Sequence, residues 1–504
     1  TLKNVLGQEG DIDQDGNLVD GDWAFMIFTS NSETQTPGDF YFPIIANTYQ
    51  LENGMFLINM TEFDSSLDLV NYSDYIHIQP GSLRFEYRDL DDLVSSRGFY
   101  ANLSDSEKSW DGNTLDSFSV LNPDGSIVDL SNDSSNLNFV IWNGSPGDDI
   151  LNTGTVNSIF SWSPGNDIYY GSINESRGSS QGDIDFNNWY WYQSSSDQND
   201  QGLVIDYSSG ELVLETDYGT TTAYNVDDIT GTPGNDHIIG SSENENLWGN
   251  GGQDIKTGGA GNDSFQIYKQ QEKLTITDYE SYEEIGLHGN RHIENGNFNF
   301  TKDNLSNELL INYDQEQNRT SIAIETDTID QDDFIILNDG QFEVAYYQLI
   351  HHYDNPETPV EERLYLYLKE IDFEHTNPYS YGINSSETEV LVIKDYQEDD
   401  YLIFTSDFGF DNQNYSDQIY LDYDVNNDQT IIDLETGNYN KDSIIIIDGQ
   451  LSQSSLNLNN GYLHLNLTYV ETLEVENPNE APTLTAGSEY ILEYENISSD
   501  KVLS

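Results

Sequence analysis

The chain has 504 residues, and 17 Lys and Arg against 91 Asp and Glu give a formal net charge of −74. This charge repels phosphate, so it argues against nucleic acid and anionic membrane surfaces as partners and favours cations. Taken alone, it is equally explained by solubility or adaptation to salt. The chain has no Cys, so we expect a bound metal in place of disulfides as the stabilising element. No apolar run approaches the roughly 18 residues of a membrane span, so we expect no membrane insertion.

An acidic loop near the N-terminus has the ligand spacing of an EF-hand. Its candidate ligands at loop positions 1, 3, 5, 7 and 12 are Asp11, Asp13, Asp15, Asn17 and Asp22. Gly16 at position 6 permits the sharp turn that this loop needs. The loop resembles that of dockerins, which implies calcium binding; the alternative is a plain acidic turn. The run after it, residues 23–28, is compatible with a helix or a strand.

Residues 231–266 consist of four consecutive nonapeptides, which is a strong internal repeat. Glycine opens each unit, glycine recurs at position four in all but the second unit, which has Glu243, and position six is acidic. These residues are Gly231, Gly234, Asp236, Glu245, Gly249, Gly252, Asp254, Gly258, Gly261 and Asp263. Position eight is apolar in three units and is Lys256 in the third.

A second, less regular block lies upstream. Its glycines and acids are Gly144, Gly147, Asp149, Gly165 and Asp167. The two acids are two nonapeptides apart, and the unit between them has Ser158 in the acidic position. Leu151, Phe160 and Tyr169 keep the apolar position in phase throughout the block.

This pattern predicts a parallel coil with calcium in its turns. Six residues form a turn, three form a short strand, and turns stack on the same side every two units. Glycine provides positive φ and the close approach of stacked turns, while the apolar residue points inward. Carbonyl and carboxylate oxygens suit calcium, which takes six to eight oxygen ligands. The expected stacked pairs are Asp149 with Asp167, Asp236 with Asp254, and Glu245 with Asp263.

The units resemble the RTX, or hemolysin-type, nonapeptides of secreted bacterial proteins, written Gly-Gly-x-Gly-x-Asp-x-(apolar)-x. Residues 258–265 match every fixed position, whereas Glu245 replaces the aspartate and Lys256 the apolar residue of their units. The resemblance implies a parallel β-roll, bound Ca²⁺, export from the cell and an extracellular or cell-surface location.

The remaining chain reads as further β-rich segments. Residues 274–287 parallel 391–404, and 333–341 parallel 442–450, which indicates two copies of one β module. Asp424 opens a loop with some calcium ligands, but we favour a hairpin turn there. The expected segments are 1–140, a β-rich domain; 141–270, the roll with an insertion at about 172–230; 271–350 and 386–475, the two copies; 351–385, a connection; and 476–504, a linker and the start of a further module. The stretch 348–374 can hold a short helix.

No sequence signal for catalysis stands out, because His-Glu-x-x-His is absent and acids are too numerous for one pair to be singled out. The aromatic run 189–192 is compatible with a carbohydrate or cell-surface ligand, or with core packing. We therefore expect an all-β fold with a short parallel β-roll flanked by β-sandwich-like modules. The expected function is that of a calcium-binding structural segment, a fragment of a large secreted RTX-like protein such as an adhesin. Alternatives are the non-catalytic tail of a secreted hydrolase, or a small enzyme or ligand-binding domain at 30–140.

Overall fold

The computed structural model describes residues 21–26, 43–50, 55–59, 82–87 and 98–470, the last range with gaps, the longest of which are 132–136, 187–200 and 290–297. Strands make up most of the described residues, which confirms the expected all-β fold. Within these ranges, none of the helices has the length and apolarity of a membrane span. The first of two compact units comprises Thr1–Phe300, Asn304–Glu343 and Tyr367–Ile371, and the second comprises Thr301–Asp303, Val344–Leu366 and Asp372–Ser504.

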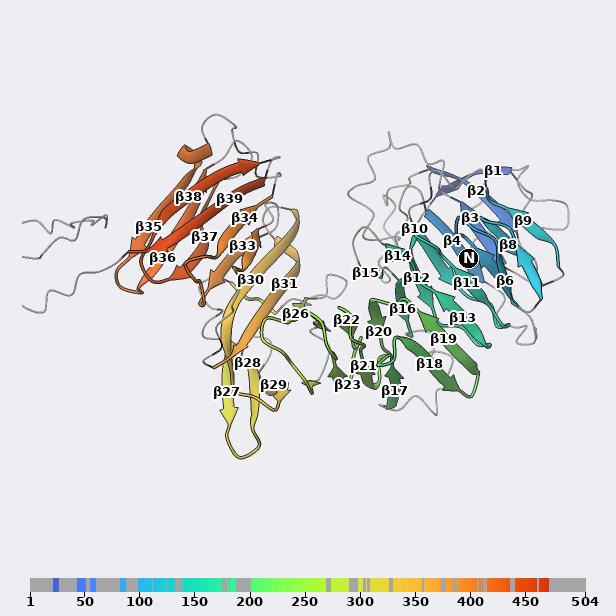
Figure 1. The fold of residues 1–504 in the computed structure, drawn as a ribbon, viewed down its shortest axis with the longest axis horizontal. Coiled ribbons are helices and arrows are strands. Elements are labelled where there is room, and N and C mark those ends of the chain that lie inside the picture. Colours follow the sequence, from blue (N-terminus) through green and yellow to red (C-terminus); the bar gives the residue numbers. More distant parts are fainter. Residues whose placement is uncertain are drawn as a thin grey trace, which may run out of the picture. The chain divides into compact units, whose positions relative to one another are not determined.

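A long stack of parallel strands runs through the first unit (Figure 1). In spatial order these strands are β4 (Ser82–Tyr87), β10 (Phe139–Asn143), β12 (Asn157–Ser161), β16 (Gly182–Asp185), β20 (Asp228–Thr230), β22 (Asn246–Trp248), β24 (Ser264–Tyr268) and β26 (Glu284–His288). The strands β16 and β20 lie inside 172–230, the region expected as an insertion. The stack therefore continues through that region.

Two further parallel stacks alternate with the first along the chain. One consists of β5 (Tyr100–Asn102), β11 (Ile150–Asn152), β13 (Asp167–Tyr170) and β19 (Gly219–Tyr224). The other consists of β17 (Gln201–Asp206), β21 (Asn235–Ile239), β23 (Gln253–Thr257), β25 (Lys273–Ile276) and β29 (Asp330–Asn338). From β20 to β25 the chain alternates strictly between two stacks, and each complete coil of the repeat takes 18 residues. This winding is the expected parallel β-roll.

Side chains that point into the roll form ladders along the stacked strands. Paired residues of the long stack that have no exposed surface are Trp142, Phe160, Ile184, Ile229, Leu247, Phe265 and Ile285. The facing ladder consists of Ile205, Ile238, Lys256, Ile276 and Leu337, also with no exposed surface. Complete burial of one large apolar side chain stabilises a fold by about 1.5–3 kcal/mol, so these ladders are the main apolar core of the roll.

The two expected module copies have matching strands. The first is built on β27 (Leu309–Asp314), β28 (Arg319–Glu325) and β29, and the second on β35 (Ile419–Asp424), β36 (Gln429–Glu435) and β37 (Asn440–Asp448). In both, the last strand also pairs in parallel with an earlier one, β25 or β33 (Thr388–Ile393). Residues 425–428 join the antiparallel strands β35 and β36, so the hairpin interpretation of the Asp424 loop is confirmed.

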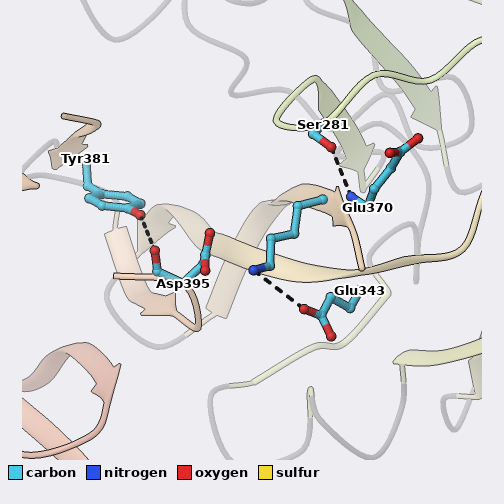
Figure 2. Close-up of polar contacts among 6 residues, drawn as sticks. Ser281, Glu343, Glu370, Tyr381 and Asp395 are labelled. Carbon is cyan, nitrogen blue, oxygen red and sulfur yellow. Dashed lines mark hydrogen bonds and ion pairs between the residues drawn. The ribbon is translucent and has the colours of Figure 1, made fainter. Parts of the chain in front are cut away.

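The expected short helix at 348–374 is wrong. This stretch contains most of β30 (Phe342–Asn355) and β31 (Thr358–Glu370). Along β31, buried leucines alternate with more exposed residues, at Leu364, Leu366 and Leu368. A period of two buries one face of a strand and would spread apolar residues around a helix. At the end of β31, Ser281 Oγ accepts the backbone N–H of Glu370 at 2.9 Å (Figure 2).

Each copy holds one tyrosine hydroxyl between two buried backbone groups. The hydroxyl donates to the carbonyl of an acid four residues later and accepts the N–H of a leucine in a distant strand, at 2.6–2.9 Å. The residues are Tyr279 and Glu283 of the first copy with Leu368 of β31, and Tyr396, Asp400 and Leu467 of the second copy. The contact therefore anchors the same tight turn in both copies.

We predict that Tyr396→Phe destabilises the second copy. The substitution leaves the buried carbonyl of Asp400 and N–H of Leu467 without their partner, and one such loss costs about 1–3 kcal/mol. Urea unfolding monitored by tyrosine fluorescence measures the change. Tyr462→Phe is the control, because Tyr462 is 46% exposed, and an equal effect of the two substitutions would contradict the assignment.

Candidate metal site

The acids at position six stack in the three pairs that their spacing predicts. These pairs are Asp149 with Asp167, Asp236 with Asp254, and Glu245 with Asp263. In each pair the backbone N–H of the first residue donates to Oδ1 of the second at 2.9 Å, across 18 residues of chain. All six side chains are at least 98% buried. The turns therefore bring carboxylates from successive coils together inside the roll.

Most of these carboxylates also accept a hydroxyl from their own turn. The donors are Ser145 to Asp149, Ser163 to Asp167, Thr232 to Asp236, and Ser241 to Glu245. Asp263 differs, because the equivalent position is Gly259. Its Oδ1 accepts the N–H of Glu245, whereas its Oδ2 is buried and has no hydrogen-bond partner. One carboxylate oxygen in the turns thus remains available to a cation.

The glycines of the pattern lie in these turns, where stacking leaves no room for side chains. Gly252 and Gly261 have φ of 71° and 132°, in the left-handed region that favours glycine. A Cβ on either would overlap the carbonyl oxygen of the turn stacked on it, that of Gly234 or Glu243. The other predicted glycines in the turns are Gly144, Gly147, Gly165, Gly231, Gly234, Gly249 and Gly258. Backbone carbonyls therefore face the stacked coil directly.

The structure adds two acids that the nonapeptide pattern does not include. In β22 and β24, an acid lies two residues before the inward-pointing side chain: Glu245 before Leu247 and Asp263 before Phe265. The neighbouring strands of the stack have the same arrangement, with Asp227 before Ile229 of β20 and Glu283 before Ile285 of β26. We call Asp227, Glu245, Asp263 and Glu283 the carboxylate column. Asp227 is 18 residues before Glu245, a spacing that could have revealed it, whereas Glu283 is 20 residues after Asp263. Asp263 N–H donates to Glu283 Oε1 at 3.4 Å.

Burial controls the ionisation of these acids. It raises the pKa of Asp149, Asp236, Glu245 and Asp227 to about 7, of Asp263 to about 6 and of Glu283 to about 8. Neighbouring carboxylates raise most of these pKa values further, whereas hydrogen bonds from backbone N–H groups lower them. In the absence of a cation, the column therefore retains protons that an exposed acid would release.

Within the described ranges, no three His, Asp or Glu side chains come together in the arrangement of a metal centre. A cation in these turns would therefore take most of its oxygen ligands from backbone carbonyls. Calcium accepts such mixed ligation by carboxylates and carbonyls.

The other predicted sites are largely outside the described residues. These include Asp11, Asp13, Asp15 and Asn17 of the N-terminal loop, as well as the aromatic run 189–192. Asp22 lies in β1 (Gly21–Met26), which pairs antiparallel with β2 (Pro43–Gln50). The run after the loop is thus a strand as far as Met26, and not the helix that follows the loop in an EF-hand.

No protein-family model and no curated protein matches this sequence.

We predict that the calcium-free roll becomes less stable as the pH rises. The unfolded chain releases these protons near its ordinary pKa values of 3.8 to 4.5, whereas the folded chain keeps them to about pH 6 or 7. Between these limits the unfolded state binds fewer protons, so the free energy of unfolding falls by up to about 1.4 kcal/mol per pH unit for each acid.

Thermal unfolding in chelator, at fixed ionic strength, measures this dependence. The melting temperature should be higher at about pH 5 than at about pH 8. Calcium should reduce the difference, because it stabilises the ionised acids. An unchanged or higher melting temperature in chelator at the higher pH would contradict the prediction.

Proposed function

We propose that this chain is a calcium-binding structural segment of a large secreted or cell-surface RTX-like protein, and that its roll folds when calcium binds. The observation that carries the proposal is Oδ2 of Asp263, a buried carboxylate oxygen with no hydrogen-bond partner. Leaving such a group unsatisfied costs about 1–3 kcal/mol, and more for a charged group. A cation that binds this oxygen would remove that cost.

The surroundings of Asp263 fit a hard cation. Asp263 is 1% exposed, and its two neighbours in the column, Glu245 and Glu283, lie on the coils before and after it. The same turns contain glycines that allow close approach of backbone carbonyls. This combination offers oxygen ligands without nitrogen or sulfur, which favours calcium over zinc or copper.

The stability of a calcium-dependent roll depends on the calcium concentration around it, which differs between the inside and the outside of a cell. Ligand that binds only the folded state stabilises it by about 2.7 kcal/mol at a hundredfold excess over Kd. Extracellular calcium modules have Kd values of roughly 10⁻⁴ to 10⁻³ M. The roll would then be unstable at cytosolic calcium and stable outside the cell, which suits an exported scaffold or adhesin.

We predict that Asp263→Asn weakens calcium binding and reduces the rise in melting temperature that calcium produces. The amide removes the negative charge and one carboxylate oxygen but nearly preserves the shape. Isothermal calorimetry and circular dichroism of the full chain, across a calcium titration, measure the two effects. Asp217→Asn is the matched control, because Asp217 is exposed in the turn between β18 (Glu211–Thr216) and β19.

Sodium chloride at matched ionic strength separates specific binding from charge screening. A wild-type chain that binds no calcium at millimolar concentration, or that responds equally to the sodium salt, would refute the proposed function.

A further inference from the structure

Lys256 occupies an apolar position in the interior of the roll. In the ladder of β21, β23 and β25 it lies between Ile238 and Ile276, and it has no exposed surface. Its Nζ donates to the carbonyls of Leu247 at 2.9 Å and Gln266 at 2.5 Å. Burial of an ammonium group is costly unless it is paired, so this position calls for a physical reason.

The charges that attract Lys256 are two of the stacked turn carboxylates. Asp254 lies two residues before it on β23, and Asp236 is stacked on Asp254. Burial lowers the pKa of Lys256 to about 8, and attraction to Asp254 and Asp236 opposes this shift. Lys256 in turn lowers the pKa of Asp236. Asp236 is also well hydrogen-bonded, because it accepts the N–H groups of Leu203 and Thr232 at 2.6 and 2.7 Å.

The carboxylate column has the opposite surroundings. The charges that act most strongly on its members belong to other acids. These are Asp228 on Asp227, Asp263 and then Glu243 on Glu245, and Asp278 and Glu280 on Asp263. The column also contains the unpartnered Oδ2 of Asp263. Because position six of successive nonapeptides alternates between the two turns of a coil, the column and the Asp236–Asp254 pair lie on opposite edges of the roll.

We propose that Lys256 is a built-in counter-cation for Asp236 and Asp254, and that it thereby directs calcium to the carboxylate column. Two ionised carboxylates and one ammonium leave a single negative charge, so a divalent ion added there would leave that group net positive. Without the ammonium, the pair presents two negative charges, which match one calcium ion. The inference rests on the proposed function, since it decides which turns bind the ion.

The test is Lys256→Met, which restores an apolar residue of similar length. Lys394→Met is the matched control, because it removes the same charge from a surface pair with Asp448 at 3.2 Å. Calorimetry of the full chain should show one additional calcium ion bound by Lys256→Met, relative to both wild type and control. Unchanged stoichiometry would overturn the proposal. A variant that stays unfolded at millimolar calcium would also overturn it, because calcium would then have failed to replace the ammonium.

A second measurement needs no calcium. Melting temperatures in chelator are compared for wild type, Lys256→Met, Asp254→Asn and the double variant. The drop in melting temperature that Lys256→Met causes should be smaller in the Asp254→Asn background than in wild type, because the Asp254→Asn background has one carboxylate fewer to neutralise. Additive effects would refute the counter-cation role. Absence of calcium binding by wild type would instead refute the proposed function, so the two failures are distinguishable.

Discussion

The close stacking of acidic turns is the constraint on which the roll depends. Parallel coils lie about 4.8 Å apart, and two unit charges at this distance repel by about 3 kcal/mol at an effective dielectric constant of roughly 20. The nonapeptide repeat places such a pair at Asp236 and Asp254 and another at Glu245 and Asp263. The same stacking buries the apolar ladders, so the fold cannot relieve the repulsion by separating its coils.

The chain relieves this repulsion differently on its two edges. Hydroxyls such as that of Thr232 and backbone N–H groups solvate Asp236, and Lys256 adds a positive charge from the interior. Asp263 has glycine where the turns of Asp149, Asp167, Asp236 and Glu245 have a hydroxyl, and the charges of Asp278 and Glu280 oppose its ionisation. Proton uptake relieves that edge partly, as the raised pKa of Glu283 indicates. A divalent cation would relieve it without requiring a low pH.

The sequence predicts those parts of the fold that a fixed coil length determines. With 18 residues per coil, the pairing of Asp236 with Asp254 and the inward position of Leu247 follow from counting. The stacking of Glu283 on Asp263 cannot be predicted from an 18-residue spacing, because this coil has 20 residues. The strands β24 and β26 nevertheless pair in parallel register. The surroundings of Lys256 could not be predicted, since its partners are carbonyls of the facing stack. In 348–374, Pro356 and Pro359 suggested a break between modules with room for a short helix, whereas the alternation of Leu364, Leu366 and Leu368 decides for a strand.

Comparison of the two module copies separates the structural role of the turn acid from its charge. Glu283 and Asp400 both accept a backbone N–H three residues earlier, those of Glu280 and Gln397, at 2.7 and 2.8 Å. Each also accepts an N–H from the preceding coil or strand, which belongs to Asp263 in the first copy and to Tyr379 in the second. The acid therefore closes the same turn whether its neighbour is an acid or a neutral side chain. In the first copy, which continues the roll through β25 and β29, the donor of this N–H is itself a buried acid, Asp263, whereas in the second copy it is Tyr379. Stacking of buried carboxylates at this turn is therefore a feature of the place where the roll meets the first copy, and the turn itself does not depend on it.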